Sequence, residues 1–162
     1  MSKIVILGTQ LGAPQIMNEL YSQINSNLAE WISQIDTTSL IKECAQNALS
    51  RLGKIKGIRK DTTISDYNGN SYNGELIGSL KTNELPNGLG VKINREGAIE
   101  FVADEYRVEW KKEIGRLREF FVRAFRAEAY KSILTIYEYN VEILATVADD
   151  GELFFDVEGV QL

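Results

Sequence analysis

The chain has 162 residues, of which 44% are hydrophobic and 25% charged, and its formal net charge is −5. This length suits one domain with its own hydrophobic core, and the composition excludes global disorder. An acidic surface repels nucleic acid and anionic membranes, which argues against a general nucleic-acid coat protein.

Two residue types that serve many enzymes are scarce in this chain. It contains no histidine and a single cysteine, Cys44. The absence of histidine excludes Ser-His-Asp and Cys-His mechanisms and histidine metal sites, and one cysteine builds neither a disulfide nor a thiolate zinc site within the chain. A carboxylate site for Mg²⁺ or Ca²⁺ stays chemically open. We assign no cofactor and no metal, and we expect Cys44 to be buried as a small hydrophobic residue.

The apolar runs of the sequence are short. The run at residues 3–7 is shorter than the roughly 7–15 apolar residues of a secretory leader, and no run approaches the roughly 20 that span a bilayer. Together with the single cysteine, this predicts a cytoplasmic protein that does not contact a membrane.

The N-terminal segment combines a short predicted strand at residues 3–7, a loop at 8–12 and a helix at 15–35. Apolar residues at steps of three or four predict the helix; they are Met17, Leu20, Ile24, Leu28, Trp31 and Ile35. Its other face is polar but almost uncharged, which indicates either a partner-binding face or a solvated face of unusual composition. We interpret residues 1–38 as an arm, an insertion or an interaction segment, ahead of a core at 39–162 in one compact domain.

The rest of the chain predicts an α+β fold. A helix ends near Leu52, before Gly53, and a basic connector follows at 54–61. Turn residues separate four short strands at 62–67, 74–80, 88–94 and 98–103, and a long amphipathic helix spans 111–136. Two strands at 140–147 and 152–160 flank an Asp-Asp-Gly turn. We expect an antiparallel sheet of about five or six strands packed against the long helix, with two N-terminal helices.

Three groups of polar or aromatic residues are candidates for a site. The basic flank of the long helix, at 111–131, could bind an acidic protein surface or a phosphate, or could simply pair with Glu113 and Glu119; it consists of Lys112, Arg116, Arg123 and Arg126. Three carboxylates precede that helix, where they either favour its N-terminus or form an acid/base site; they are Asp104, Glu105 and Glu109. Exposed aromatic residues are expected at Tyr67, Tyr72 and Tyr106, but their acidic neighbours argue against RNA binding.

Four short stretches lie in a distinctive order within residues 39–160: DYNG at 66–69, GLGVKI at 88–93, IEFVAD at 99–104 and DDGEL at 149–153. In their order and spacing the chain resembles a conserved family of unknown function from cyanobacteria, from algal plastids as a hypothetical chloroplast reading frame, and from scattered bacteria. Family members tend to carry a tryptophan directly after the Ala-Asp step, where this chain has Glu105 and Tyr106 and reaches Trp110 only later. Family members also tend to begin with a strand directly before the first helix. In this chain residues 8–38 separate the predicted strand at 3–7 from the helix that ends near Leu52.

The resemblance implies no catalytic residue, because the family has none established. Genes of the family often lie beside that of an AAA-type ATPase, which implies an adaptor or assembly role. Our leading hypothesis is a non-enzymatic protein-protein interaction or adaptor protein, which binds a protein partner or itself through the helix at 15–35 or the basic flank. The alternatives are a protein that binds a small ligand, an anion or a nucleic acid through the basic flank, and a hydrolase that uses Asp104, Glu105 and Glu109.

Overall fold

The computed structural model describes residues 4–12, 37–136 and 139–161. The helix predicted at 15–35, with its proposed partner-binding residues Met17, Leu20, Ile24 and Trp31, lies outside these residues. Within the described chain, seven strands and two helices form an α+β fold.

Five strands form one antiparallel sheet in the order β1-β5-β4-β3-β2. Their bounds are β1 Ile4–Gly12, β2 Arg59–Asp61, β3 Gly78–Lys81, β4 Leu89–Ile93 and β5 Ala98–Asp104. β1 pairs with β5 from Ile4 opposite Asp104 to Gly12 opposite Ala98, with an irregularity between Gly8 and Gly12. Because side chains alternate along a strand, β5 directs Ile99, Phe101 and Ala103 into one hydrophobic core.

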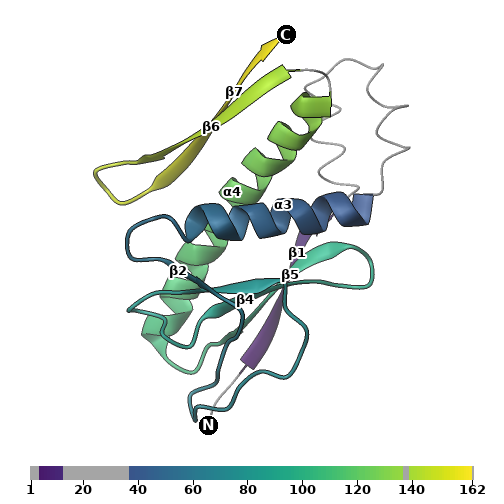
Figure 1. Cartoon of the computed structure of the whole chain (residues 1–162). Coiled ribbons are helices and arrows are strands. Elements are labelled where there is room, and N and C mark those ends of the chain that lie inside the picture. The colour runs from purple at the N-terminus through teal and green to yellow at the C-terminus, as the bar shows by residue number, and fades with distance from the viewer. Residues whose placement is uncertain (1–3, 13–36, 137–138, 162) are drawn as a thin grey trace.

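The helices α3 (Thr37–Leu52) and α4 (Val108–Ile136) pack against each other, α3 near β2 and β3 and α4 against β5. In Figure 1 α3 crosses the long, inclined α4. Apolar residues spaced by three or four give α4 a buried stripe, within which Phe121 meets Phe101 edge-on at 5.4 Å between ring centroids and stacks on Phe125 at 5.9 Å. The core face of α3 is buried at Ile41, Ala45, Ala48, Leu49 and Leu52.

Cys44 lies within this helix-helix contact. Its thiol is fully buried, 3.6 Å from the Ser132 hydroxyl oxygen, which confirms the predicted burial. Burial raises the pKa of Cys44 to about 11, because a thiolate loses its hydration inside the core.

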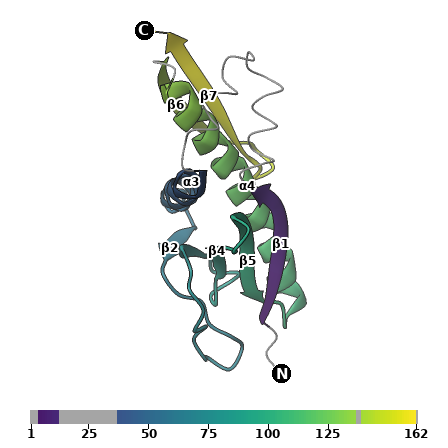
Figure 2. The same ribbon diagram turned by 90° about the vertical axis from the view of Figure 1, so that its right-hand side faces the viewer.

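The last two strands, β6 (Tyr139–Val147) and β7 (Leu153–Gln161), form a separate antiparallel hairpin. Figure 2 shows that the hairpin lies along the C-terminal part of α4, away from the larger sheet. Gly151 closes the predicted turn with φ +84°, a backbone conformation that glycine adopts at little cost. Arg123 of α4 fixes the start of β7, because it donates to Glu152 at 2.6 Å and to the Leu153 carbonyl at 2.9 Å.

The prediction of a single sheet of five or six strands therefore needs correction, because the seven described strands form two sheets, one of five strands and one of two. The closing hairpin does not extend the sheet; instead it packs its own inner face, including the buried Leu153, on α4. Of the two predicted N-terminal helices, the one that ends near Leu52 is α3, whereas the one at 15–35 lies outside the described residues. The long amphipathic helix is confirmed, although it begins at Val108 rather than at residue 111.

Four local predictions also need correction. β2 falls inside the predicted connector at 54–61, and the strand predicted at 62–67 reduces to a single bridge between Ser65 and Ser71. Because all three residues of β2 are exposed on a short edge strand, they show no apolar alternation. The strand predicted at 74–80 begins only at Gly78, and residues 8–12, predicted as a loop, belong to β1.

Neither α3 nor α4 combines the length and the apolar composition that crossing a membrane requires, and these are the helices that the structure describes.

Candidate functional site

Aromatic residues from two distant segments meet where β5 ends and α4 begins. The ring of Tyr67 lies 4.5 Å from that of Tyr106 and 6.0 Å from that of Trp110, measured between centroids. The Arg107 guanidinium lies 5.5 Å from the ring centroids of both Tyr67 and Trp110. We call these four residues the aromatic patch.

The aromatic patch is open to solvent although its base is buried. Tyr67 is 43% exposed and Tyr106 is 47% exposed, whereas Trp110 retains only 9% of its surface. Beside it, Val108 is 82% exposed at the start of α4. Trp110 thus anchors the patch in the core, and the two tyrosines remain accessible to solvent.

Arg107 holds its charge over aromatic rings without an acidic partner. It forms no ion pair with any carboxylate of the described chain, so its guanidinium donors face solvent. Each cation-ring contact of this kind contributes about 0.5–1 kcal/mol at an exposed site, which limits the positions of the side chain. A fixed, unpaired guanidinium beside apolar rings is suited to receiving a carboxylate.

The buried carboxylate of Asp104 holds the two halves of the patch together. It lies at the end of β5 with no exposed surface, and it accepts hydrogen bonds from the Tyr67 amide at 2.6 Å and the Tyr106 amide at 2.8 Å. Bonds from neutral donors to an ionised acceptor are stronger than neutral pairs. Asp104 therefore fixes the backbone of both tyrosines.

Asp66 shapes the loop that carries Tyr67. Its carboxylate accepts hydrogen bonds from the Asn68 amide at 2.9 Å and the Asn70 amide at 2.8 Å. Gly69 completes the turn with φ +83° and donates to the Asp66 carbonyl at 3.0 Å. The DYNG stretch is thus a turn stabilised by its own carboxylate, as is typical of aspartate in turns.

The three candidate carboxylates do not act as one group. Asp104 is committed to two backbone amides, Glu105 is half-buried, and Glu109 is exposed in the first turn of α4, where its charge favours the helix. None of the three belongs to the described lining of the cavity along α4, which is introduced below. Their arrangement supports a structural role.

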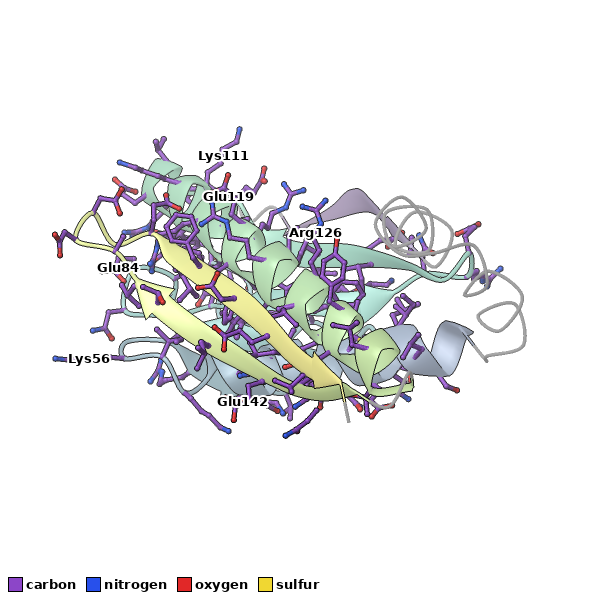
Figure 3. The ribbon with its side chains drawn as sticks, turned by 90° about the horizontal axis from the view of Figure 1, so that it is seen from above. Lys56, Glu84, Lys111, Glu119, Arg126 and Glu142 are labelled. Atoms are coloured by element: carbon purple, nitrogen blue, oxygen red, sulfur yellow. The ribbon has the colours of Figure 1, made fainter. Side chains whose placement is uncertain are left out.

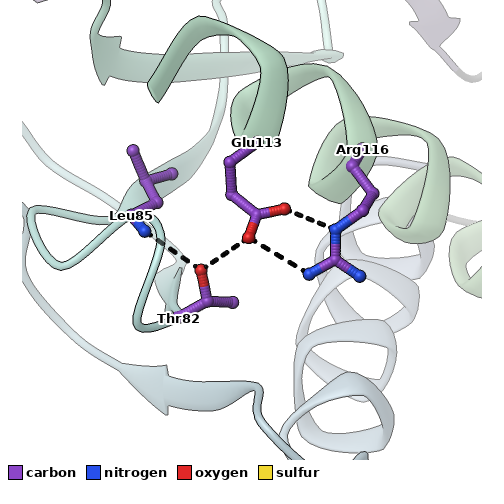
Figure 4. Close-up of polar contacts among 4 residues, drawn as sticks. All are labelled: Thr82, Leu85, Glu113 and Arg116. Atoms are coloured by element: carbon purple, nitrogen blue, oxygen red, sulfur yellow. Dashed lines mark hydrogen bonds and ion pairs between the residues drawn. The ribbon is translucent and has the colours of Figure 1, made fainter. Parts of the chain in front are cut away.

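A buried carboxylate network joins α4 to the turn after β3. Glu113 accepts hydrogen bonds from the Thr82 hydroxyl at 2.9 Å and from Arg116, and the Leu85 amide donates to Thr82 at 3.1 Å (Figure 4). Burial opposes ionisation of Glu113, but the bonds from Arg116 and Thr82 outweigh it and lower the pKa of the carboxyl. The Glu113 carboxylate, the Thr82 hydroxyl and the Arg116 guanidinium thus form hydrogen bonds with one another within the protein.

Two residues of the basic flank form ion pairs with glutamates of this chain. Arg116 pairs with Glu113 and lies over the Phe120 ring, and Arg123 pairs with Glu152 at 2.6 Å and with Glu119 at 3.8 Å. Lys112 is exposed, and Arg126 is exposed at the rim of a cavity. The structure therefore does not bring the four cations together as one free surface.

That cavity, of about 460 Å³, lies along α4 beside β5 and carries more arginine than any other residue type. We call it the arginine cavity; its described lining consists of Phe101, Gly115, Arg118, Glu119, Val122, Arg123 and Arg126. Figure 3 shows Glu119 and Arg126 along the same helix. Arg118 lies over the Phe101 ring at 5.3 Å, and its buried Nε has no hydrogen-bond partner within the described part of the chain.

Metal binding finds no support in the described residues, which contain no cluster of three or more carboxylate or thiol ligands. Comparisons with protein-family models, with curated proteins and with solved structures found no match to this chain. The functional argument therefore depends on the residues and contacts described above.

Sequence reasoning identified Tyr67 and Tyr106 as exposed but did not select Arg107, Trp110 or Arg118. The first two of these lie within four residues of Tyr106, so an Arg-Val-Glu-Trp run beside an exposed tyrosine was an available signal. Arg118 had none, since its importance arises from the Phe101 ring on a different element.

Proposed function

We propose that this chain is a non-enzymatic adaptor protein that binds another protein through the aromatic patch. The observation that carries the proposal is the Arg107 guanidinium, which lies 5.5 Å from the ring centroids of both Tyr67 and Trp110 and forms no ion pair with a carboxylate among the described residues. Tryptophan, tyrosine and arginine are the residues that dominate binding energy at protein interfaces.

The chemistry of the patch specifies the kind of partner segment. The rings of Tyr67 and Tyr106 would pack against an apolar or aromatic side chain, while Arg107 would receive a neighbouring carboxylate. Asp66 and Asp104 already fix the supporting backbone, so little conformational entropy is lost on binding. The partner segment therefore carries an apolar residue beside an aspartate or glutamate.

The family resemblance makes an AAA-type ATPase of the same cell the first partner to test. The helix at 15–35 and the basic flank, which the sequence suggested as binding surfaces, stay predictions for the same partner or for self-association.

Site-specific photo-crosslinking tests the proposal. A photoreactive residue at position 108, next to the patch, should link to a peptide that contains an apolar residue beside a carboxylate. The same residue at position 144 serves as the control, because Leu144 is also exposed, at 46%, but lies on the hairpin.

Identical crosslinked peptides from positions 108 and 144 would contradict a role for the patch. So would a position-108 peptide that lacks an acidic residue, because Arg107 would then have no charge to receive.

A further inference from the structure

We infer that the arginine cavity is a binding site for a small phosphate ester, independent of the aromatic patch. The inference begins with Arg118, which lines the cavity and whose buried Nε has no hydrogen-bond partner among the residues that the structure describes. Buried polar groups in native proteins are almost always satisfied, so a guanidinium with an unused donor is suited to an added acceptor. The donor belongs to a cavity that is large enough for a ligand.

The geometry of Arg118 suits an oxyanion. Its guanidinium lies over the Phe101 ring, with its carbon 5.3 Å from the centroid, so the planar fork is held in one orientation. A planar guanidinium recognises phosphate or carboxylate through paired N–H donors, and stacking on a ring reduces the entropy lost on binding. Arg118 forms no ion pair with a carboxylate in the described part of the chain.

The charge of the lining favours phosphate over carboxylate. Arg118, Arg123 and Arg126 belong to the described lining, whose one acidic residue is Glu119. Arg123 is already shared between Glu152 and Glu119, but Arg118 forms no ion pair with a described carboxylate, so its positive charge is available within an acidic chain. A phosphate monoester carries about two negative charges and three acceptor oxygens near neutral pH, whereas a carboxylate carries one charge.

The volume of the cavity and its apolar lining limit the size and the chemistry of the ligand. Its volume of about 460 Å³ lies within the range of small-molecule sites. Phe101, Val122 and Gly115 provide apolar or open surface, and a methyl group built on Gly115 would meet no atom within 4 Å. A phosphate ester with a small organic part would therefore place its phosphoryl group at Arg118 and its organic part toward Gly115 and Val122.

Nuclear magnetic resonance of the arginine Nε–Hε groups tests the site directly. The full ¹⁵N-labelled chain is titrated with pyrophosphate and with glycerol phosphate at constant ionic strength, and Arg118→Lys identifies the Arg118 signal by its loss. We expect a saturable shift of that signal. An unmoved Arg118 signal at saturating phosphate ester would overturn the inference.

Calorimetry of variants gives a second readout. Arg118→Gln should weaken glycerol phosphate binding by at least about tenfold, which corresponds to about 1.4 kcal/mol. Arg95→Gln, at an exposed arginine outside the cavity lining, should leave it unchanged. If Arg118→Gln does not fold, Glu119→Gln decides, because removing the one acidic side chain of the lining should strengthen binding about two- to fivefold.

Three further probes separate the sources of an oxyanion. Succinate binding in preference to glycerol phosphate would overturn the choice of phosphate. Binding of only single-stranded RNA, or of only vesicles that contain phosphatidic acid, would replace the small ligand by a macromolecular one and overturn the inference. Equal loss of affinity in Arg118→Gln and Arg95→Gln would show a diffuse charge effect, which also contradicts a defined site.

Discussion

At the scale of single residues, buried carboxylates organise the surface of this protein. Asp104 and Glu113 are both buried, and each accepts hydrogen bonds from a segment distant in sequence. The first fixes the loop of Tyr67, and the second fixes the turn at Thr82. Because an ionised carboxylate is costly to bury without such donors, both residues are tied to the folded arrangement around them.

Replacing Asp104 by asparagine should loosen the aromatic patch. The amide has one acceptor oxygen, so it cannot serve the Tyr67 and Tyr106 amides as the carboxylate does. We expect a loss of about 1–3 kcal/mol in the free energy of unfolding, measured with urea, and red-shifted Trp110 fluorescence in a Trp31→Phe background. Unchanged stability and fluorescence would contradict the role assigned to Asp104.

Replacing Glu113 by glutamine should give a pH-dependent loss of stability. The folded-state pKa of Glu113 lies below its unfolded value, so the ionised group stabilises the fold above about pH 4.3 and this contribution is lost as pH falls through the folded pKa. We expect the variant to lose about 1–3 kcal/mol at pH 7 and to approach the parent protein in strong acid. Glu96→Gln, at an exposed turn, is the control, and a loss independent of pH would refute this account.

Cys44 should resist alkylation while the protein is folded. Its pKa of about 11 leaves only about one thiol in a thousand ionised at pH 8, and the side chain is fully buried. Mass spectrometry after iodoacetamide treatment should find the native chain unmodified and the denatured chain fully modified. Equal labelling rates for the two states would show that the thiol is accessible.

At the scale of elements, apolar periodicity decided what the sequence could predict. α3 and α4 carry regular buried positions, and both helices, β4 and the hairpin were predicted close to their observed bounds. β2 could not be found in this way, since Arg59, Lys60 and Asp61 are all exposed. The placement of the hairpin on α4 depends on the hydrogen bond from Arg123 to the Leu153 carbonyl. These two residues are thirty positions apart, so no local sequence pattern indicates their contact.

The hairpin should depend on a single buried leucine. Leu153 retains 1% of its surface against α4, so Leu153→Ala should cost about 2–5 kcal/mol of unfolding free energy. Leu144→Ala, at a leucine that is 46% exposed on the same hairpin, should cost less than about 1 kcal/mol. Similar losses in the two variants would contradict the observed packing, and urea denaturation measures both.

At the scale of the whole molecule, the fold brings together residues that the sequence separates. Tyr67 belongs to the loop between β2 and β3, whereas Tyr106, Arg107 and Trp110 belong to the junction of β5 and α4. The sequence predicted exposed tyrosines but not their contact, because that contact depends on Asp104 reaching the Tyr67 amide. The arginine cavity likewise requires β5 to place Phe101 beneath Arg118.

The affinity of a purified crosslinked partner for three forms of the chain tests the central claim most directly. By calorimetry, Tyr106→Ala should weaken binding by at least about thirtyfold, the effect of losing an interface hot spot of about 2 kcal/mol. The parent chain and Leu144→Ala should bind equally. Unchanged affinity in Tyr106→Ala, or an equal loss in Leu144→Ala, would contradict the aromatic patch as the binding surface.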